Sequence, residues 1–236
     1  IMTTASADQP LKGLRYLLQA VSLLRPDYPA LEVLVVGKLQ QGGPTQKLLG
    51  ELGLTEAVQF VSGISNDEMA DLYRSATMVV CPSLYEGFGL PAGEAMACGV
   101  PVISSDGGAL PEVVGDAGIV VPAGDSDALA KAVASLLDSE ALRKKLGAAG
   151  RARIETHFCW RLCAEHLVHY YRAIIAGQKR DVRPDVPQVS TAGDPASSAL
   201  PGTTNSGIPR KEKTHTRSVP VVNGQAGRDE NSGEAA

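Results

Sequence analysis

The sequence predicts an α/β fold in which a doubly wound, Rossmann-like parallel sheet is followed by C-terminal helices. Apolar runs of four to six residues alternate with amphipathic helical stretches over the first 121 residues, a pattern typical of parallel sheets covered by helices. The connections between these segments are short, as in doubly wound folds. No apolar run approaches the ~20 residues that a membrane-spanning helix needs.

Each predicted element follows from a local pattern. The apolar runs predict strands at 2–5, 31–36, 58–61, 78–81, 100–104 and 118–121. Apolar residues at helical spacing predict a helix over 14–24, ended by Pro26, and Ser65 with Glu68 forms a capping box before a helix that runs to about residue 75. Further helices are expected at 126–137, 140–155 and 160–176, the last closed by Gly177.

The composition changes after residue 177, which divides the chain in two. Residues 178–236 contain no aromatic residue and are rich in Pro, Ser, Thr and Gly, so they bury too little apolar surface to offset the entropy of ordering. We expect a folded domain at 1–177 and a disordered low-complexity tail at 178–236. The basic cluster at 210–213 is interpreted as solvated, with docking to anionic lipid or protein as the alternative.

Charge and cysteine content exclude several function classes. A net charge of -4 with both signs mixed argues against nucleic-acid binding, which requires a clustered basic surface. The four cysteines lack CxxC spacing and are predicted to be reduced core thiols. Cys159, Cys163 and His166 share a helical face, but packing is favoured over a metal site because a fourth ligand is missing.

The first residues carry neither a basic leader nor an apolar stretch. We therefore expect a cytoplasmic protein, with a peripheral contact at the inner face of the membrane left open.

The segment from Glu86 to Glu94 carries the most specific chemical signal. Its two carboxylates lie eight residues apart around a glycine-rich turn, which follows the predicted strand at 78–81. Pro91 is suited to the first position of a helix and Gly99 to its C-terminal cap, so a helix is expected to start near Pro91. The N–H groups and positive dipole end of this helix offer an anion site that needs no metal.

Topology is expected to bring Lys12 to the same place. In the common doubly wound strand order 3-2-1-4-5-6, strands one and four are neighbours at the switch point, and ligands bind outside their carboxyl ends. Lys12 follows strand one, and the segment from Glu86 to Leu90 follows strand four. Two stretches more than seventy residues apart are therefore predicted to converge on one crevice.

The groups in this crevice suit the parts of a nucleotide-sugar. Lys12 would neutralise the diphosphate as a point charge, and the N–H groups near Gly89 and Leu90 would complete the anion site. Glu94, expected in the first helical turn, would accept hydrogen bonds from the ribose hydroxyls. Glu86, four residues before the helix, would reach the hexose.

The segment resembles the E-x7-E motif of retaining glycosyltransferases of the GT-B fold, family 4, and the resemblance extends from Lys12 to about residue 175. It implies the C-terminal, donor-binding half of an enzyme that transfers a hexose from a UDP- or GDP-sugar to a glycan, lipid or small-molecule acceptor, with retention of configuration. It implies no cofactor and no metal, and Glu86 and Lys12 as the catalytic residues. The N-terminal acceptor domain is not in this chain, so the chain alone is expected to be inactive.

The resemblance adds donor-binding positions and one departure. Gly37 matches a close-approach glycine beside the nucleotide, although a glycine after a strand is often only a turn, and Gly63 with Ile64 matches the stretch that lines the base. Gly87 and Phe88 lie within the motif itself. Family members often carry an arginine a few residues before the lysine, whereas residues 4–8 hold no basic side chain. Either another cation such as Lys38 substitutes for it, or the departing diphosphate is stabilised less strongly.

The resemblance also bears on mechanism. Retention through a covalent intermediate would need a carboxylate nucleophile at ~5 Å from an acid partner. Glu86 is the only local candidate, yet its matching position in the family holds sugar hydroxyls. Front-face attack is therefore favoured, in which the departing phosphate takes the acceptor proton.

Three alternatives stay open. Gly87, Gly89 and Ala92 also satisfy the G-x-G-x-x-A fingerprint of NAD(P)-binding oxidoreductases, with Asp106 nineteen residues beyond Gly87. That fingerprint normally follows the first strand directly, whereas residues 82–86 intervene here after the fourth. The second alternative is a non-catalytic nucleotide-sugar-binding module that works with a partner chain. The last alternative is an α/β domain whose glycines are incidental.

Overall fold

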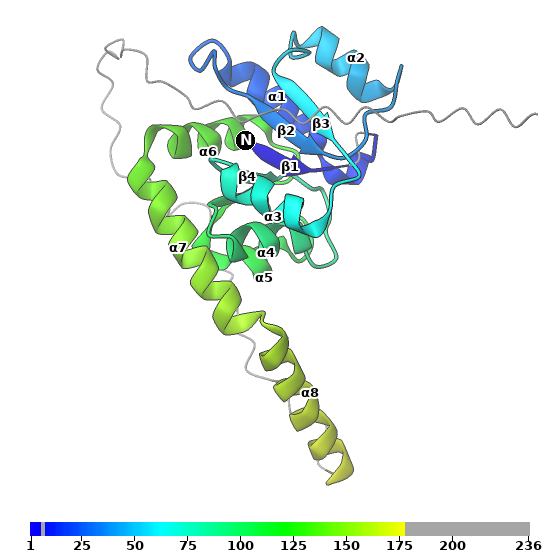
Figure 1. Cartoon of the computed structure of the whole chain (residues 1–236), viewed down its shortest axis with the longest axis vertical. Coiled ribbons are helices and arrows are strands. Elements are labelled where there is room, and N and C mark those ends of the chain that lie inside the picture. The colour runs from blue at the N-terminus through cyan, green and yellow to red at the C-terminus, as the bar shows by residue number, and fades with distance from the viewer. Residues whose placement is uncertain (6–7, 178–236) are drawn as a thin grey trace, which may run out of the picture. The chain divides into compact units, whose positions relative to one another are not determined.

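The computed structural model describes residues 1–5 and 8–177, which form a six-stranded sheet with helices on both faces (Figure 1). All strand pairs are parallel, and the strand order is β3-β2-β1-β4-β5-β6. The predicted doubly wound order is therefore confirmed, with β1 and β4 as neighbours at the switch point. The predicted tail at 178–236 and its basic cluster lie outside the described residues.

Every predicted strand is present, with ends that differ by at most two residues from the expectation. The strands are β1 (Met2–Thr4), β2 (Val33–Val36), β3 (Val58–Val61), β4 (Val79–Cys81), β5 (Val102–Ser105) and β6 (Ile119–Val121). β4 is buried along its whole length, and β5 likewise, because helices cover both faces of the sheet centre.

The helices include two that the sequence patterns did not predict. They are α1 (Leu14–Leu24), α2 (Pro44–Glu51), α3 (Asn66–Ser75), α4 (Leu90–Ala97), α5 (Leu110–Val114), α6 (Ser126–Asp138), α7 (Glu140–His157) and α8 (Trp160–Ile175), with 3-10 turns at Pro10–Lys12 and Gly115–Ala117. The unpredicted helices are α2 and α5. Each begins with a proline in its first turn, and each is too short to show a clear helical period.

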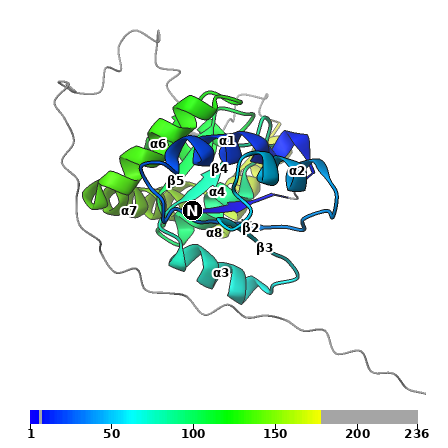
Figure 2. The same cartoon turned by 90° about the horizontal axis from the view of Figure 1, so that it is seen from above.

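Helices cover both faces of the sheet (Figure 2). Each face carries its own hydrophobic core. On one face, α1 packs against α6, and Leu17 and Val133 are fully buried there. On the other face, α4 packs against α3, α5 and α7, and Met96 and Leu110 are fully buried. Burial of each such side chain contributes about 1.5–3 kcal/mol, so both helical layers hold the sheet edge in place.

Helix α8 differs from the others because most of its apolar side chains are exposed. These are Trp160, Leu167, Val168, Tyr170, Tyr171, Ile174 and Ile175. Among the helices of the described residues, α8 included, none combines the length and the apolar character that crossing a bilayer requires.

The core-thiol prediction for the four cysteines is partly wrong. Cys81 is buried in β4, but Cys163 is exposed on α8, and Cys98 and Cys159 are only half-buried. The prediction fails for Cys163 because the apolar face of α8 on which it lies is not packed into either core.

Candidate functional site

The loops that follow β1 and β4 are held against each other at the carboxyl edge of the sheet. The Leu84 N–H donates to the Leu11 carbonyl at 2.8 Å. Gly13 has φ +65°, and a Cβ on it would lie 1.9 Å from the Pro82 carbonyl oxygen. Only glycine permits so close an approach, and this contact sets the separation of the two loops that carry Lys12 and Glu86.

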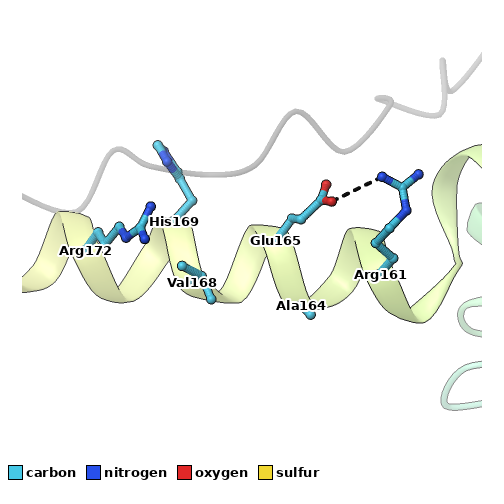
Figure 3. Close-up of a pocket in the computed structure, with 6 residues that line it drawn as sticks. All are labelled: Arg161, Ala164, Glu165, Val168, His169 and Arg172. Atoms are coloured by element: carbon cyan, nitrogen blue, oxygen red, sulfur yellow. Dashed lines mark hydrogen bonds and ion pairs between the residues drawn. The ribbon is translucent and has the colours of Figure 1, made fainter.

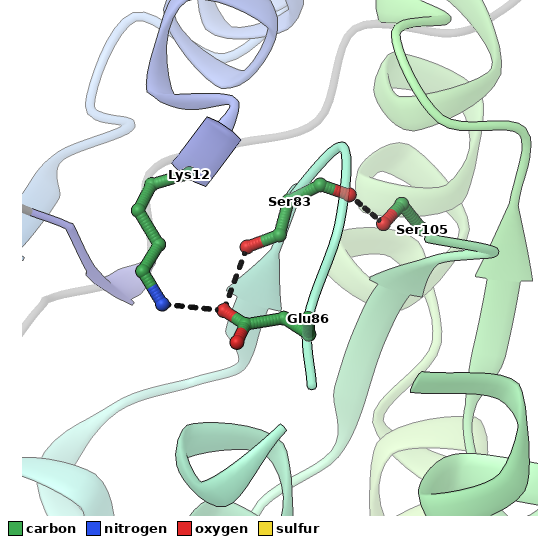
Figure 4. Close-up of polar contacts among 4 residues, drawn as sticks. All are labelled: Lys12, Ser83, Glu86 and Ser105. Carbon is green, nitrogen blue, oxygen red and sulfur yellow. Dashed lines mark hydrogen bonds and ion pairs between the residues drawn. The ribbon is translucent and has the colours of Figure 1, made fainter. Parts of the chain in front are cut away.

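Lys12 and Glu86 meet across these loops in an ion pair (Figure 4). Lys12 Nζ lies 2.6 Å from Glu86 Oε1, and the two side chains are 31% and 15% exposed. The Ser83 hydroxyl donates to the same Oε1 at 3.0 Å. The predicted convergence of Lys12 and Glu86 is confirmed by the geometry, and Glu86 is held by two donors from two loops.

The backbone around Glu86 is fixed by the loop after β5. The Ala109 N–H donates to the Glu86 carbonyl at 2.9 Å, and Gly108 forms a parallel bridge with Glu86. The Ser105 hydroxyl donates to the Ser83 carbonyl (Figure 4). Three loops, those after β1, β4 and β5, therefore determine where the Glu86 carboxylate lies.

The N-terminus of α4 lies directly after Glu86 in the chain. Gly89 adopts φ +91° as its N-cap residue, and the N–H groups of Ala92 and Gly93 donate to the Gly89 carbonyl at 3.0 and 3.1 Å. The N–H groups of Gly89 and Leu90 precede these first helical bonds, as a helix N-terminus requires. They are the donors that the predicted anion site needs.

Glu94 occupies a different helical position from the one expected. Because the left-handed Gly89 lets α4 begin at Leu90, Glu94 lies past the first turn of the helix, and the first-turn prediction is wrong. Glu94 is an exposed residue, and its Oε2 accepts a part-buried hydrogen bond from the hydroxyl of Tyr73, at 2.9 Å. Tyr73 comes from α3 and is buried.

The pKa of the buried Cys81 thiol is affected by the charged residues of the site. Burial is the main cause that raises the pKa of its thiol to about 12. The carboxylates of Glu86 and Glu94 also raise it, and Lys12 lowers it. All three charged groups thus act on one buried sulfur at the end of β4, and that sulfur stays a neutral thiol at neutral pH.

The remaining donor-binding positions lie on the same edge or in the same loop. Gly37 follows β2 and donates its N–H to the Val61 carbonyl at 2.8 Å, and Lys38 next to it is exposed. Gly63 and Ile64 follow β3, with Gly63 exposed and at φ +74°. Gly87 and Phe88 are exposed in the loop before α4.

Phe88 has a protein partner. Its ring makes an edge-to-face contact with that of Phe158, at 6.0 Å between centroids. Phe158 is the C-cap residue of α7, so the loop before α4 packs against the junction of α7 and α8.

Within the described residues, no group of three or more His, Cys, Asp or Glu side chains is arranged so that it could hold a metal ion. Asp125, which precedes α6, accepts a hydrogen bond from the Ala128 N–H at 2.9 Å and so acts as the N-cap of that helix. A shallow hollow elsewhere is lined by Arg161, Ala164, Glu165, Val168, His169 and Arg172 (Figure 3). All six residues belong to α8. Among them, Arg161 and Glu165 form an ion pair one turn apart along the helix.

Comparison with known proteins agrees with this geometry. The sequence profile of the glycosyl transferases group 1 family matches residues 1–153. The chain belongs to this family. The chain is 47% identical over 180 residues to the MMP α-(1→4)-mannosyltransferase of Mycolicibacterium hassiacum. The aligned region covers 75% of this chain and 43% of that protein. The chain is 36% identical over 171 residues to the O-antigen chain mannosyltransferase B of Escherichia coli, covering 70% of this chain and 44% of that protein.

Solved structures support the same assignment. Sucrose-phosphate synthase from Thermosynechococcus elongatus superposes with a TM-score of 0.65 at 33% identity, over 75% of this chain and 45% of that one. The expected Rossmann-like fold of GT-B glycosyltransferases is therefore confirmed for this group 1 domain. The chain spans less than half the length of the curated relatives described above.

Two side chains of the site were not predicted from the sequence, Ser83 and Tyr73. Ser83 lies three residues before Glu86, between the strand and the motif. This short spacing was the only sequence feature that could have predicted their contact. Tyr73 lies 21 residues before Glu94, within an ordinary amphipathic helix, so no sequence spacing links the two.

Proposed function

We propose that this chain is the donor-binding half of a retaining, family 4 glycosyltransferase that transfers a hexose from a nucleoside diphosphate sugar without a metal. One observation carries the proposal: Lys12 and Glu86 meet at the switch point of the sheet, next to the N-terminus of α4. A cation and backbone N–H groups together suit a diphosphate, and an adjacent carboxylate suits sugar hydroxyls. Membership of the group 1 family supports the reaction class.

Different residues bind the different parts of the nucleotide-sugar. Lys12 and the N–H groups of Gly89 and Leu90 stabilise the diphosphate, whose negative charge grows as the bond to the sugar breaks. Glu86 accepts hydrogen bonds from the hexose, and Glu94 accepts them from the ribose. Gly37, Lys38, Gly63 and Ile64 line the nucleotide along the edge of β2 and β3.

In the proposed reaction, the bond between the anomeric carbon and the diphosphate oxygen breaks while the acceptor hydroxyl attacks the same face of the sugar. The acceptor proton passes to the departing phosphate oxygen. Atoms and charges balance without a metal or a cofactor, because Lys12 and the backbone N–H groups offset the charge of the leaving group. Retention follows from attack on the face that the diphosphate leaves.

The sugar and the acceptor are proposed from the relatives' activities. Two relatives at 47% and 36% identity are named as mannosyltransferases, which favours mannose as the transferred hexose. The acceptor is a glycan, lipid or small molecule bound by an N-terminal half. A cytoplasmic location, with peripheral membrane contact through the acceptor, is part of the same proposal.

Nucleotide binding by the 236-residue chain tests this function. Titration calorimetry with UDP, GDP, ADP and NAD, without divalent metal and again with EDTA, should detect binding of UDP or GDP at equal affinity in both buffers. Lys12→Ala should weaken that binding about tenfold, the size of one lost charge-assisted hydrogen bond. Tight NAD binding with no affinity for UDP or GDP would instead support the dinucleotide alternative and reject the proposal.

A further inference from the structure

Tyr73 combines a buried ring with a hydroxyl that reaches the donor site. Its ring is 1% exposed and packs in the core between α3, α4 and the sheet. Its hydroxyl is 2.9 Å from Glu94 Oε2, on the next helix of that layer. A phenylalanine would fill the core equally well, so packing does not account for the hydroxyl.

The hydroxyl is a permanent donor to Glu94. Burial is the main cause that raises the pKa of Tyr73, and the Glu94 carboxylate raises it further, because both disfavour a phenolate. The phenol therefore keeps its proton at neutral pH. The direction of the hydrogen bond is fixed, from Tyr73 to the carboxylate of Glu94.

A single donor on Oε2 leaves most of the carboxylate available. An ionised carboxylate has about four acceptor sites on its two oxygens, and Tyr73 uses one of them. Glu94 is otherwise exposed on α4, and a free glutamate side chain loses up to about 1.5–2 kcal/mol of rotamer entropy when a ligand fixes it. A residue that fixes the carboxylate beforehand removes part of that cost from binding.

We infer that Tyr73 is a positioning residue of the nucleotide site, which holds the Glu94 carboxylate oriented so that its free oxygen accepts the ribose hydroxyls. The inference rests on the ribose-binding role proposed for Glu94. It assigns a function in donor affinity to a core residue of α3 that touches no substrate itself.

Tyr73→Phe tests the inference because it removes one oxygen and keeps the ring. We expect the dissociation constant of the 236-residue chain for UDP or GDP, whichever binds, to rise about three- to tenfold, as for one hydrogen bond of ordinary strength. Tyr28→Phe is the matched control, since Tyr28 donates to Asp138 at the same 2.9 Å, but this hydrogen bond is exposed and is not part of the nucleotide site. The control should bind nucleotide like the wild type.

A double-mutant cycle with Glu94→Ala separates positioning from general packing. Glu94→Ala should weaken nucleotide binding, and adding Tyr73→Phe should weaken it no further, because the group that Tyr73 positions is gone. Equal losses from Tyr73→Phe in both backgrounds would overturn the inference in favour of a packing effect.

The remaining outcomes distinguish the inference from the proposed function. If Glu94→Ala weakens binding and Tyr73→Phe alone does not, the inference is overturned and the role of Glu94 stands. If Glu94→Ala binds nucleotide like the wild type, the ribose role of Glu94 is wrong and the inference falls with it. If the wild-type chain binds neither UDP nor GDP, the proposed function is overturned first.

Discussion

At the scale of single residues, the free site neutralises its own charges. Lys12 and Glu86 form a half-buried ion pair at 2.6 Å, with Ser83 as a second donor to the same oxygen. A diphosphate that binds Lys12 competes with Glu86 for the ammonium group. Glu86 then has to form new hydrogen bonds, and in the proposed function the sugar hydroxyls supply them.

Glu86→Gln should therefore affect transfer and binding in opposite ways. In an enzyme that includes the acceptor half, we expect transfer to fall about 10²–10³-fold, the usual cost of removing one group that stabilises the transition state. Affinity for free UDP or GDP should stay equal or increase, because Lys12 no longer has an anionic partner. Initial-rate kinetics and calorimetry measure the two effects, and wild-type turnover in this variant would contradict the assignment of Glu86.

At the scale of elements, the site depends on how closely two loops approach. Gly13→Ala places a Cβ against the Pro82 carbonyl and forces a residue with a side chain to φ +65°. We expect the free energy of unfolding to fall by about 2–5 kcal/mol, from left-handed backbone strain plus overpacking. Chemical denaturation followed by circular dichroism measures the change.

The control for this substitution is Gly53→Ala, which has the same φ of +65° but open space around the added Cβ. Backbone strain alone should cost it about 1–2 kcal/mol. Equal losses in the two variants would show that the contact between the loops is not under steric constraint.

Helix α3, which carries Tyr73, starts with a capping box whose strength depends on pH. The Ser65 N–H donates to Glu68 Oε2 at 2.7 Å, and this hydrogen bond is the main cause that lowers the pKa of Glu68. Since the folded pKa lies below the unfolded one, the stabilisation is full above the unfolded pKa and is lost as the pH falls through the folded pKa.

Glu68→Ala should consequently lower the melting temperature near neutral pH, and its difference from the wild type should shrink towards zero below about pH 4. Melting curves at several pH values measure this. Glu56→Ala, which removes an exposed carboxylate from a turn, is the control and should show a smaller difference at neutral pH. A Glu68→Ala difference that is constant with pH would contradict the capping role of its charge.

At the scale of the whole molecule, the chain covers 43% of the length of the mannosyltransferase to which it is 47% identical. We expect the 236-residue chain to bind the donor nucleotide without transferring sugar, because the proposed acceptor site lies in an N-terminal half. A longer chain that includes such a half should transfer, and its Glu86→Gln variant should transfer about 10²–10³-fold more slowly. Sugar release from UDP- and GDP-hexoses measures both, and equal transfer by the short chain would contradict the division of labour.

Most of the fold was predictable from local patterns. Apolar runs located all six strands, because a strand buried between two helical layers has to be apolar along its length. Helices α2 and α5 escaped prediction because a helix of eight or five residues shows too little of the 3.6-residue period. The prediction for Cys163 failed because an apolar helical face does not by itself state what covers it.

The sequence by itself determined the alternating strands and helices, and with the common doubly wound strand order these predicted that Lys12 lies near Glu86. The reason is that parallel strands end at a common edge of the sheet, where the loops of neighbouring strands meet. Only the tertiary structure decided how the two glutamates are held. Ser83 reaches Glu86 through a turn of the loop, and Tyr73 reaches Glu94 through the packing of α3 against α4. Such contacts depend on side-chain direction and helix packing, which no spacing along the chain encodes.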